Sequence, residues 1–444
     1  MKKRTVTVVI AALVLLAAQS AFSDSRILSL EECLKIAIKN SPQVGSQREQ
    51  LRSARTNVLR NYGYFLPSAS LSMSAGRTFI GPTGSIAIDE QGRAIKPTGF
   101  DYESYSFRLQ STMNVFDWGV SVRRLNEARS TADAAGYDLE WQQDIITAVV
   151  IRSYYDFLRT KKLKEVQEQG VDAAKRNLEQ VEAFFTIGSN TKADVLQARV
   201  RLANTQLALI TARNNMELAK SKLANDLNLP LDEDFEIVES ITIKPIEPSL
   251  EEEVTYMFTH RSDLLSLRSR VRSARNALAA SQNSRWPSLG AYFSYSWNDR
   301  QWPEDSNFFR SEYSWGIGLS LNFDIFDRFA TKSSIMSAKA QTRIAEYQLQ
   351  MGKLDAVYEV QQIVLSLKEA MERINLSEET VSQAEENLRL AEERYRVGAG
   401  TILETIEAGV SLTEAKANLV QAQCDYLIAK AELLRATGRE VRAD

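Results

Sequence analysis

Two long stretches without proline most constrain the fold of this chain. They span residues 119–185 and 328–396. At 1.5 Å per residue, a helix over either stretch would reach roughly 100 Å, far beyond the helices of a globular domain, and such length points to a coiled coil. Apolar positions at steps of three and four follow at 202–223 and 412–433, which is the coiled-coil period. Amphipathic helices on an ordinary core remain the alternative, but they do not easily explain this length.

The chain also repeats itself. Residues 187–191 (IGSNT) match residues 397–401 (VGAGT) at an offset of 210, and Pro67-Ser68 matches Pro287-Ser288 at an offset of 220. A repeat of this kind indicates a duplicated structural unit. We therefore expect a first unit over 27–230, a linker over 231–248 and a second unit over 249–438.

Each unit is predicted to run helix, strand, strand, long helix, helix. The first helix is expected from Ser29 to Tyr62, because Ser29 and Glu32 form the pattern of a capping box. Ser249 and Glu252 repeat this pattern in the second unit, and that helix is expected to close at Pro287.

The expected strands lie at about 68–79, 104–116, 288–298 and 312–325. Apolar and small polar residues alternate along each, most clearly in the last, where Tyr313, Trp315, Ile317 and Leu319 alternate with serine and glycine. Alternation over about ten residues is typical of transmembrane strands, with aromatic residues near the interfaces. A half-buried soluble hairpin would also alternate, so that interpretation stays open here.

Four strands cannot close a barrel in lipid, where an open edge would leave backbone groups unpaired. Known barrels have at least eight strands. The chain is therefore expected to pool its strands with copies of itself. Two chains would give eight strands and three would give twelve, and the sequence does not by itself favour three copies over four.

The N-terminus predicts a secretory signal peptide over 1–23. Lys2, Lys3 and Arg4 precede an apolar run that ends near Ala18, and Ala21-Phe22-Ser23 offers small residues for cleavage. The run is shorter than the ~20 residues of a membrane-spanning helix.

Composition argues against several classes of function. A net charge of −3 argues against nucleic-acid binding, which needs a basic face. One histidine, His260, and two cysteines, Cys33 and Cys424, leave no zinc, haem or disulfide framework. No phosphate-binding glycine loop is present. We expect no cofactor, no metal, no catalytic residue and no enzymatic activity, with the cysteines as small core residues.

Glu404 and Glu407 are the acids of interest. They lie three apart, one turn beyond Gly398 and Gly400, and so share a helix face. In a symmetric oligomer each would repeat as a ring, and acid rings select cations in pores. The alternative is that they merely complement a helix N-terminus.

Taken together, these features resemble the TolC-type outer-membrane efflux protein family. The marks are Ser29 to Leu34 with Asn40-Ser41-Pro42, then Leu66-Pro67-Ser68, Phe116 to Gly119, and Tyr395 to Gly398 leading to Glu404 and Glu407. Each is short, but their order, duplication and spacing are specific. The resemblance implies a mixed fold of α-helices and transmembrane β-strands: a homotrimer with a twelve-stranded barrel in outer-membrane lipid and a long α-helical periplasmic tunnel.

The resemblance also implies function and partners. It implies an exit duct of a tripartite efflux or type I secretion system, working with a periplasmic adaptor (membrane fusion) protein and an inner-membrane pump of the RND or ABC type. Glu404, Glu407, Tyr395 and Asp194 would form the periplasmic gate, although Gly400 stands where the family carries a basic residue. The adaptor-contact tips would be Gly188, Thr191, Gly398 and Thr401.

Two rival interpretations remain. A non-transporting periplasmic or surface coiled-coil scaffold or adhesin would be extracted without detergent. An outer-membrane enzyme would be expected to depend on His260.

Overall fold

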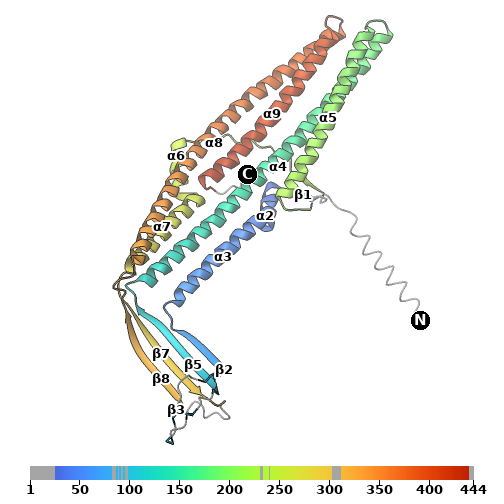
Figure 1. Ribbon diagram of the computed structural model, residues 1–444. Coiled ribbons are helices and arrows are strands. Elements are labelled where there is room, and N and C mark those ends of the chain that lie inside the picture. The colour runs from blue at the N-terminus through green and yellow to red at the C-terminus, as the bar shows by residue number, and fades with distance from the viewer. Residues whose placement is uncertain are drawn as a thin grey trace, which may run out of the picture. The chain divides into compact units, whose positions relative to one another are not determined.

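A computed structural model describes residues 26–82, 87–88, 90–91, 94–95, 99–230, 234–239, 241–302 and 312–439. The predicted signal peptide, 1–23, lies outside these residues. In the described part of the chain, no helix has both the length and the apolar character to cross a bilayer. Figure 1 shows helices and strands in this order: β1 (Arg26–Leu28), α2 (Leu30–Asn40), α3 (Pro42–Gly63), β2 (Ser68–Ile80), β3 (Ala87–Ile88), β4 (Ala94–Ile95), β5 (Phe100–Phe116), α4 (Val120–Thr186), α5 (Lys192–Asp226), β6 (Phe235–Ile237), α6 (Leu250–His260), α7 (Ser262–Asn283), β7 (Ser288–Asp299), β8 (Tyr313–Asn322), α8 (Ala330–Arg396) and α9 (Ile402–Thr437).

These elements form two compact units. Among the described residues, the helical unit comprises those within 26–49, 137–265 and 351–439, and the sheet unit those within 50–136 and 266–350. Neither unit is a single run of sequence, because α3, α4, α7 and α8 each contribute to both.

The expectation of one continuous helix from Ser29 to Tyr62 is wrong. The chain leaves the helical conformation at Ser41, with φ −64° and ψ 119°, because the ring of Pro42 disfavours helical geometry at the residue before it. The Ser41 hydroxyl then accepts a hydrogen bond from the Val44 amide at 3.3 Å. The capping box of Ser29 and Glu32 is confirmed.

The matching helix of the second half is also broken, at Arg261 (φ −69°, ψ 118°), and Ser249 makes no side-chain cap. No proline causes this break. Arg261 is almost fully buried and pairs with Asp263 at 2.8 Å and Glu359 at 2.6 Å. Gly438 lies against the break so closely that a Cβ there would approach the His260 carbonyl carbon to 2.8 Å. Tertiary packing therefore sets this boundary.

The expected linker contains a strand. β6 pairs in parallel with β1, with Leu28 opposite Ile237. Leu28, Phe235 and Ile237 are buried in a core cluster of the helical unit, together with Cys33. Cys424 is also buried. The segment between the halves thus holds β1 against the core.

The sheet unit contains an antiparallel sheet with the order β2-β5-β7-β8 (Figure 1). β5 starts four residues before its expected start, because Phe100 pairs with Ile80 at the end of β2. β8 ends at Asn322, where the chain turns towards α8.

One face of this sheet is polar and the other is apolar and exposed. Serine pairs join neighbouring strands on the polar face, with Ser74 and Ser106 hydroxyls 2.7 Å apart. Apolar side chains such as Met73, Ile317 and Leu321 are 64%, 74% and 69% exposed. In a half-buried soluble hairpin, the rest of the protein would cover the apolar face. An apolar face that stays exposed instead marks a surface for interaction or for membrane lipid.

Tyr292 is the exception to the alternation, since it stands on the polar face. It lies opposite Gly318, and a Cβ at Gly318 would come within 2.7 Å of the Tyr292 hydroxyl oxygen. The missing side chain at Gly318 therefore makes room for the ring.

Candidate functional site

The predicted site residues lie at the ends of two helical hairpins of the helical unit, α4–α5 and α8–α9 (Figure 1). Gly188 and Gly398 end α4 and α8 in the left-handed conformation, with φ of +82° and +75°, which glycine adopts at least cost. Neither position crowds a neighbour, since a Cβ at either would meet no heavy atom within 4 Å. The backbone requirement alone explains both glycines.

The first turn leads into a complete capping box. The Thr191 hydroxyl accepts from the Asp194 amide at 3.3 Å, and the Asp194 carboxylate accepts from the Thr191 amide and hydroxyl, both at 2.7 Å. This reciprocal arrangement satisfies otherwise unpaired donors at the start of α5. The structure thus engages the Asp194 carboxylate within its own turn.

The second turn is capped differently. The Thr401 hydroxyl accepts from the Glu404 amide and donates to the Glu404 carboxylate, both at 3.3 Å, while the other carboxylate oxygen faces Arg394 at 3.6 Å. Gly400 sits tightly against the end of α8, where a Cβ would lie 3.1 Å from the Arg394 Cβ. Arg394, six residues before Gly400, is therefore the basic residue beside Glu404 in this turn. Sequence reasoning missed it.

Tyr395 joins the two hairpin tips. Its ring is buried with Val181, Val195, Ala198 and Ile402, drawn from all four helices of the hairpins. The Asn190 side-chain amide donates to the Tyr395 hydroxyl at 2.5 Å. Burial, the largest cause, raises the pKa of Tyr395, while this hydrogen bond lowers it and the nearby Asp194 raises it.

Asn190 was not among the predicted site residues. It occupies the position before the capping threonine, which Gly400 occupies in the second turn. The sequence did contain a signal for Asn190: at this position of the repeat, the first copy has a polar side chain and the second has glycine. We call the cluster of Tyr395, Asn190, Val181, Val195, Ala198 and Ile402 the tip core.

Glu407 differs from Glu404 because it is exposed. No side-chain hydrogen bond or ion pair joins its carboxylate to any residue in the described ranges. Glu404 and Glu407 lie in the first two turns of α9, so their side chains project from the same side of the helix. The structure leaves one acid fully available to solvent and one partly paired.

A groove of about 460 Å³ runs beside the tip core between the two hairpins. It is lined by charged side chains from α4, α5 and α8, among them Arg176, Arg201, Arg389 and Glu392. Burial lowers the pKa of Arg201. Arg389 is held between Glu386 at 2.6 Å and Glu393 at 2.7 Å.

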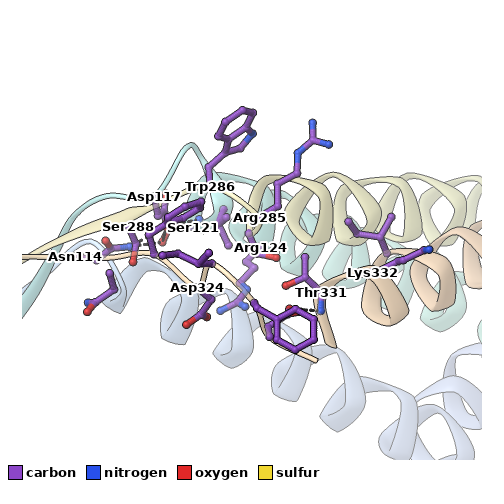
Figure 2. A pocket seen from close by; sticks show the side chains of 18 of the residues that line it. Asn114, Asp117, Ser121, Arg124, Arg285, Trp286, Ser288, Asp324, Thr331 and Lys332 are labelled. Atoms are coloured by element: carbon purple, nitrogen blue, oxygen red, sulfur yellow. Dashed lines mark hydrogen bonds between the residues drawn. The ribbon is translucent and has the colours of Figure 1, made fainter. Parts of the chain in front are cut away.

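The sheet unit has its own cavity, of about 660 Å³, where the strands meet α4, α7 and α8 (Figure 2). Asp117 fixes one wall by accepting from the Gly119 amide at 3.1 Å and the Ser121 amide at 2.8 Å. Asp327 accepts from the Thr331 amide at 2.6 Å in the same way. The two aspartates thus organise the turns that lead from strand to long helix.

No cluster of metal-ligating side chains occurs among the residues that the structure describes. His260 is the last residue of α6, and its ring stacks on that of Tyr256 with 3.8 Å between centroids.

The chain is similar in sequence to known outer membrane proteins. Residues 33–228 and 258–439 match the family model described as "Outer membrane efflux protein". The chain is 23% identical over 358 residues to the outer membrane protein TolC of Escherichia coli K12, covering 77% of this chain and 70% of that protein. It is 21% identical over 425 residues to the outer membrane efflux protein BepC of Brucella suis, covering 96% and 87%.

Solved structures show the same fold. The outer membrane protein VceC from Vibrio cholerae aligns with a TM-score of 0.76 at 21% identity, covering 92% of this chain and 96% of that one. The CmeC outer membrane channel of Campylobacter jejuni aligns with a TM-score of 0.79 at 16% identity, covering 92% and 85%. Because the family model matches most of both halves of the sequence, this chain belongs to the outer membrane efflux protein family, whose members are transport channels of the outer membrane.

Proposed function

We propose that the chain is the exit duct of a tripartite efflux or type I secretion system. Three copies would pool their strands into a twelve-stranded barrel in outer-membrane lipid and their helices into a periplasmic tunnel. The duct would perform no chemistry and would pass solutes delivered by an inner-membrane pump of the RND or ABC type through a periplasmic adaptor protein.

The observation that carries this proposal is the exposed apolar face of a sheet with only four strands. Leu71, Leu319 and Trp315 are each more than half exposed, and the opposite face is lined by serine pairs. Water would penalise such a face, whereas lipid would cover it. A sheet in lipid must close on itself, and the barrel needs strands from more than one chain.

The long helices support the tunnel. α4 and α8 each contain 67 residues, so each would reach about 100 Å if straight. The duplicated arrangement proposed for 27–230 and 249–438 would give each subunit two such helices, and three subunits would give six.

We further propose that the hairpin tips form the periplasmic gate. In a trimer, Glu404 and Glu407 would form acid rings on the axis, while Tyr395 and Asp194 would hold the tips in their packed form. Gly188, Thr191, Gly398 and Thr401 would present the turns to the adaptor. Opening would require the adaptor to contact the open tip more favourably than the closed one.

Extraction and conductance test the proposal. The mature chain should leave the cell envelope only with detergent, show the mass of three chains after correction for bound detergent, and produce discrete conductance in planar bilayers. A monomer released by salt or osmotic shock, with no conductance, would instead support a scaffold or adhesin.

The transported solute needs a separate experiment. Curated relatives include the multidrug resistance outer membrane protein MdtQ of Escherichia coli O157:H7. On this basis we propose small toxic compounds as cargo. Deleting the gene should lower the tolerated concentration of several unrelated compounds, and secretion of a protein that stops instead would favour the type I alternative.

A further inference from the structure

Arg108 is the one charged side chain on the polar face of the four described strands β2, β5, β7 and β8. It alternates in β5 with the apolar residues and shares its face with Ser106 and Gln110. The register sets Ser72 of β2 and Ser296 of β7 directly opposite it. Because directly opposite residues of neighbouring strands point to the same face, Arg108 is surrounded by uncharged polar side chains.

The other charged residues of these strands occupy positions in line with the apolar face and lie near one end of the sheet: Arg77, Asp101, Glu103 and Asp299. Each of them is engaged locally. Arg77 donates to Asp101 at 2.6 Å. Glu103 accepts from the Tyr105 hydroxyl at 2.9 Å, and Asp299 accepts from the next backbone amide at 2.6 Å. Charge near the end of a transmembrane strand costs little compared with charge at the membrane centre.

Arg108 differs from these four residues because it is exposed and unpaired. No hydrogen bond or ion pair joins its guanidinium to any residue in the described ranges. No carboxylate shares its face of the described strands. A guanidinium stays charged at physiological pH and presents a planar fork of donors that matches carboxylate and phosphate groups. The positive charge of Arg108 is therefore available to a ligand.

We infer that Arg108 attracts anionic solutes to the inner wall of the barrel. The inference rests on the proposed barrel, which turns the polar face of the sheet towards the lumen and the apolar face towards lipid. The solutes that fit are small molecules with carboxylate, sulfate or phosphate groups. An ionisable residue within a membrane-spanning region is costly and marks a path of ions or substrates.

Three copies of the chain would place three such charges around one lumen. Rings of arginine favour anions in pores. Twelve strands spaced ~4.8 Å apart and tilted by ~40° give a backbone radius of roughly 12 Å, and the Debye length is about 10 Å at 0.1 M salt. Because the side chains point inward from the wall, their field would cover the whole cross-section of the lumen.

The sign of this charge is opposite to that of Glu404 and Glu407. The barrel and the proposed gate would thus favour solutes of opposite charge along one duct. A measurement over the whole duct would mix the two effects. The potential at Arg108 therefore needs a measurement that is local to the sheet.

Thiol modification provides this measurement. Ser72→Cys places a thiol directly opposite Arg108, in the full chain and in membranes. Two methanethiosulfonate reagents share the same reactive group, but one carries an anionic sulfonate and the other a cationic trimethylammonium. A positive potential at the thiol speeds the anionic reagent and slows the cationic one. Each rate is divided by the rate of the same reagent with free cysteine, and the ratio of anionic to cationic rate then reports the local potential.

Arg108→Gln should lower this ratio at least fivefold. Arg108→Lys should keep it within twofold, because it keeps the charge. Arg77→Gln is the matched control, since it removes the same charge from the opposite face, and it should change the ratio less than twofold. With Arg108 in place, raising the salt from 0.01 M to 1 M should bring the ratio close to one, because the Debye length falls from about 30 Å to about 3 Å. The chain without new cysteines gives the background, since Cys33 and Cys424 are buried.

A ratio that neither Arg108→Gln nor salt changes overturns the anion site and leaves the barrel intact, as does an equal fall in Arg77→Gln. The barrel has its own control in the same membranes. Met73→Cys lies on the apolar face, where lipid should slow both charged reagents at least tenfold relative to Ser72→Cys. Equally fast modification of Met73→Cys and Ser72→Cys would show water on both faces and would overturn the proposed function as well.

Discussion

The two hairpin tips of the helical unit follow one plan but use it differently. Each ends its first helix with a left-handed glycine and starts its second with a capping threonine and an acid three residues later. In the α4–α5 tip the acid, Asp194, returns to its own threonine at 2.7 Å. In the α8–α9 tip the corresponding Glu404 accepts from its threonine hydroxyl at 3.3 Å and also faces Arg394 at 3.6 Å.

The residue before each threonine extends this difference. Asn190 reaches the hydroxyl of Tyr395 in the other hairpin, whereas Gly400 has no side chain to do so. The polar groups of the first tip therefore hold its structure, whereas the second tip leaves Glu407 exposed and Glu404 only partly paired. The first tip thus has a structural role, and the second tip carries the carboxylate that is open to solvent.

The largest effect is expected from Tyr395→Ala. Removing a buried aromatic ring costs roughly 3–5 kcal/mol, and this ring belongs to both tips, so amide hydrogen exchange should accelerate at least 100-fold in both. Tyr395→Phe keeps the ring and loses only the hydrogen bond with Asn190, worth about 1 kcal/mol. Faster exchange in the α8–α9 tip alone would show that Tyr395 does not join the hairpins.

Charge at the second tip is the next test. Glu404→Gln combined with Glu407→Gln should lower the ratio of cation to anion permeability several-fold in planar bilayers and weaken block by divalent cations, because acid rings attract cations. Asp194→Asn is the matched control and should change the ratio less than twofold, since that carboxylate is bound within its turn. An equal effect of both variants would remove the distinction between the tips.

Features with a local signal in the sequence were predicted better than features that depend on contacts between distant residues. Glycine at 188 and 398 and threonine at 191 and 401 are local signals, and the turns form where those signals stand. The break at Ser41 was also encoded locally, by Pro42, but the long periodic pattern around it masked the signal. A helix break of this kind can be predicted when the residue before each proline is considered separately from the pattern around it.

Other features depend on residues far apart in the chain. The break at Arg261 follows from Glu359 and from the close approach of Gly438, and the pairing of β1 with β6 joins segments about 210 residues apart. The contact of Asn190 with Tyr395 is of the same kind. None of these pairs has a spacing or motif that would bring them together before the fold is known.

A smaller effect is expected from the capping threonines. Replacing a capping threonine by alanine typically costs about 1 kcal/mol, which would raise local exchange about fivefold. Thr191→Ala should have a larger effect than Thr401→Ala, because the bond from the Thr191 hydroxyl to Asp194 is 2.7 Å long, whereas that from the Thr401 hydroxyl to Glu404 is 3.3 Å long. Serine at each position is the control, since it keeps the hydroxyl. Equal effects at the two tips would mean that the complete capping box adds nothing.

The smallest effect concerns the ionisation of Tyr395. Because burial raises its pKa, the folded tip favours the neutral hydroxyl. Its contribution to tip stability is therefore complete below the ordinary tyrosine pKa of about 10 and is lost as pH rises through the higher folded value. At neutral pH no change is expected.

Ultraviolet absorbance near 295 nm isolates this group when the titration of Tyr395→Phe is subtracted from that of the unchanged chain. The difference curve should have its midpoint above 10. Asn190→Ala should move that midpoint further upward, because the hydrogen bond from Asn190 lowers the pKa while burial raises it. A midpoint at or below 10 would mean that water reaches the hydroxyl, and the tip core would then be open where the comparison of the two tips requires it to be closed.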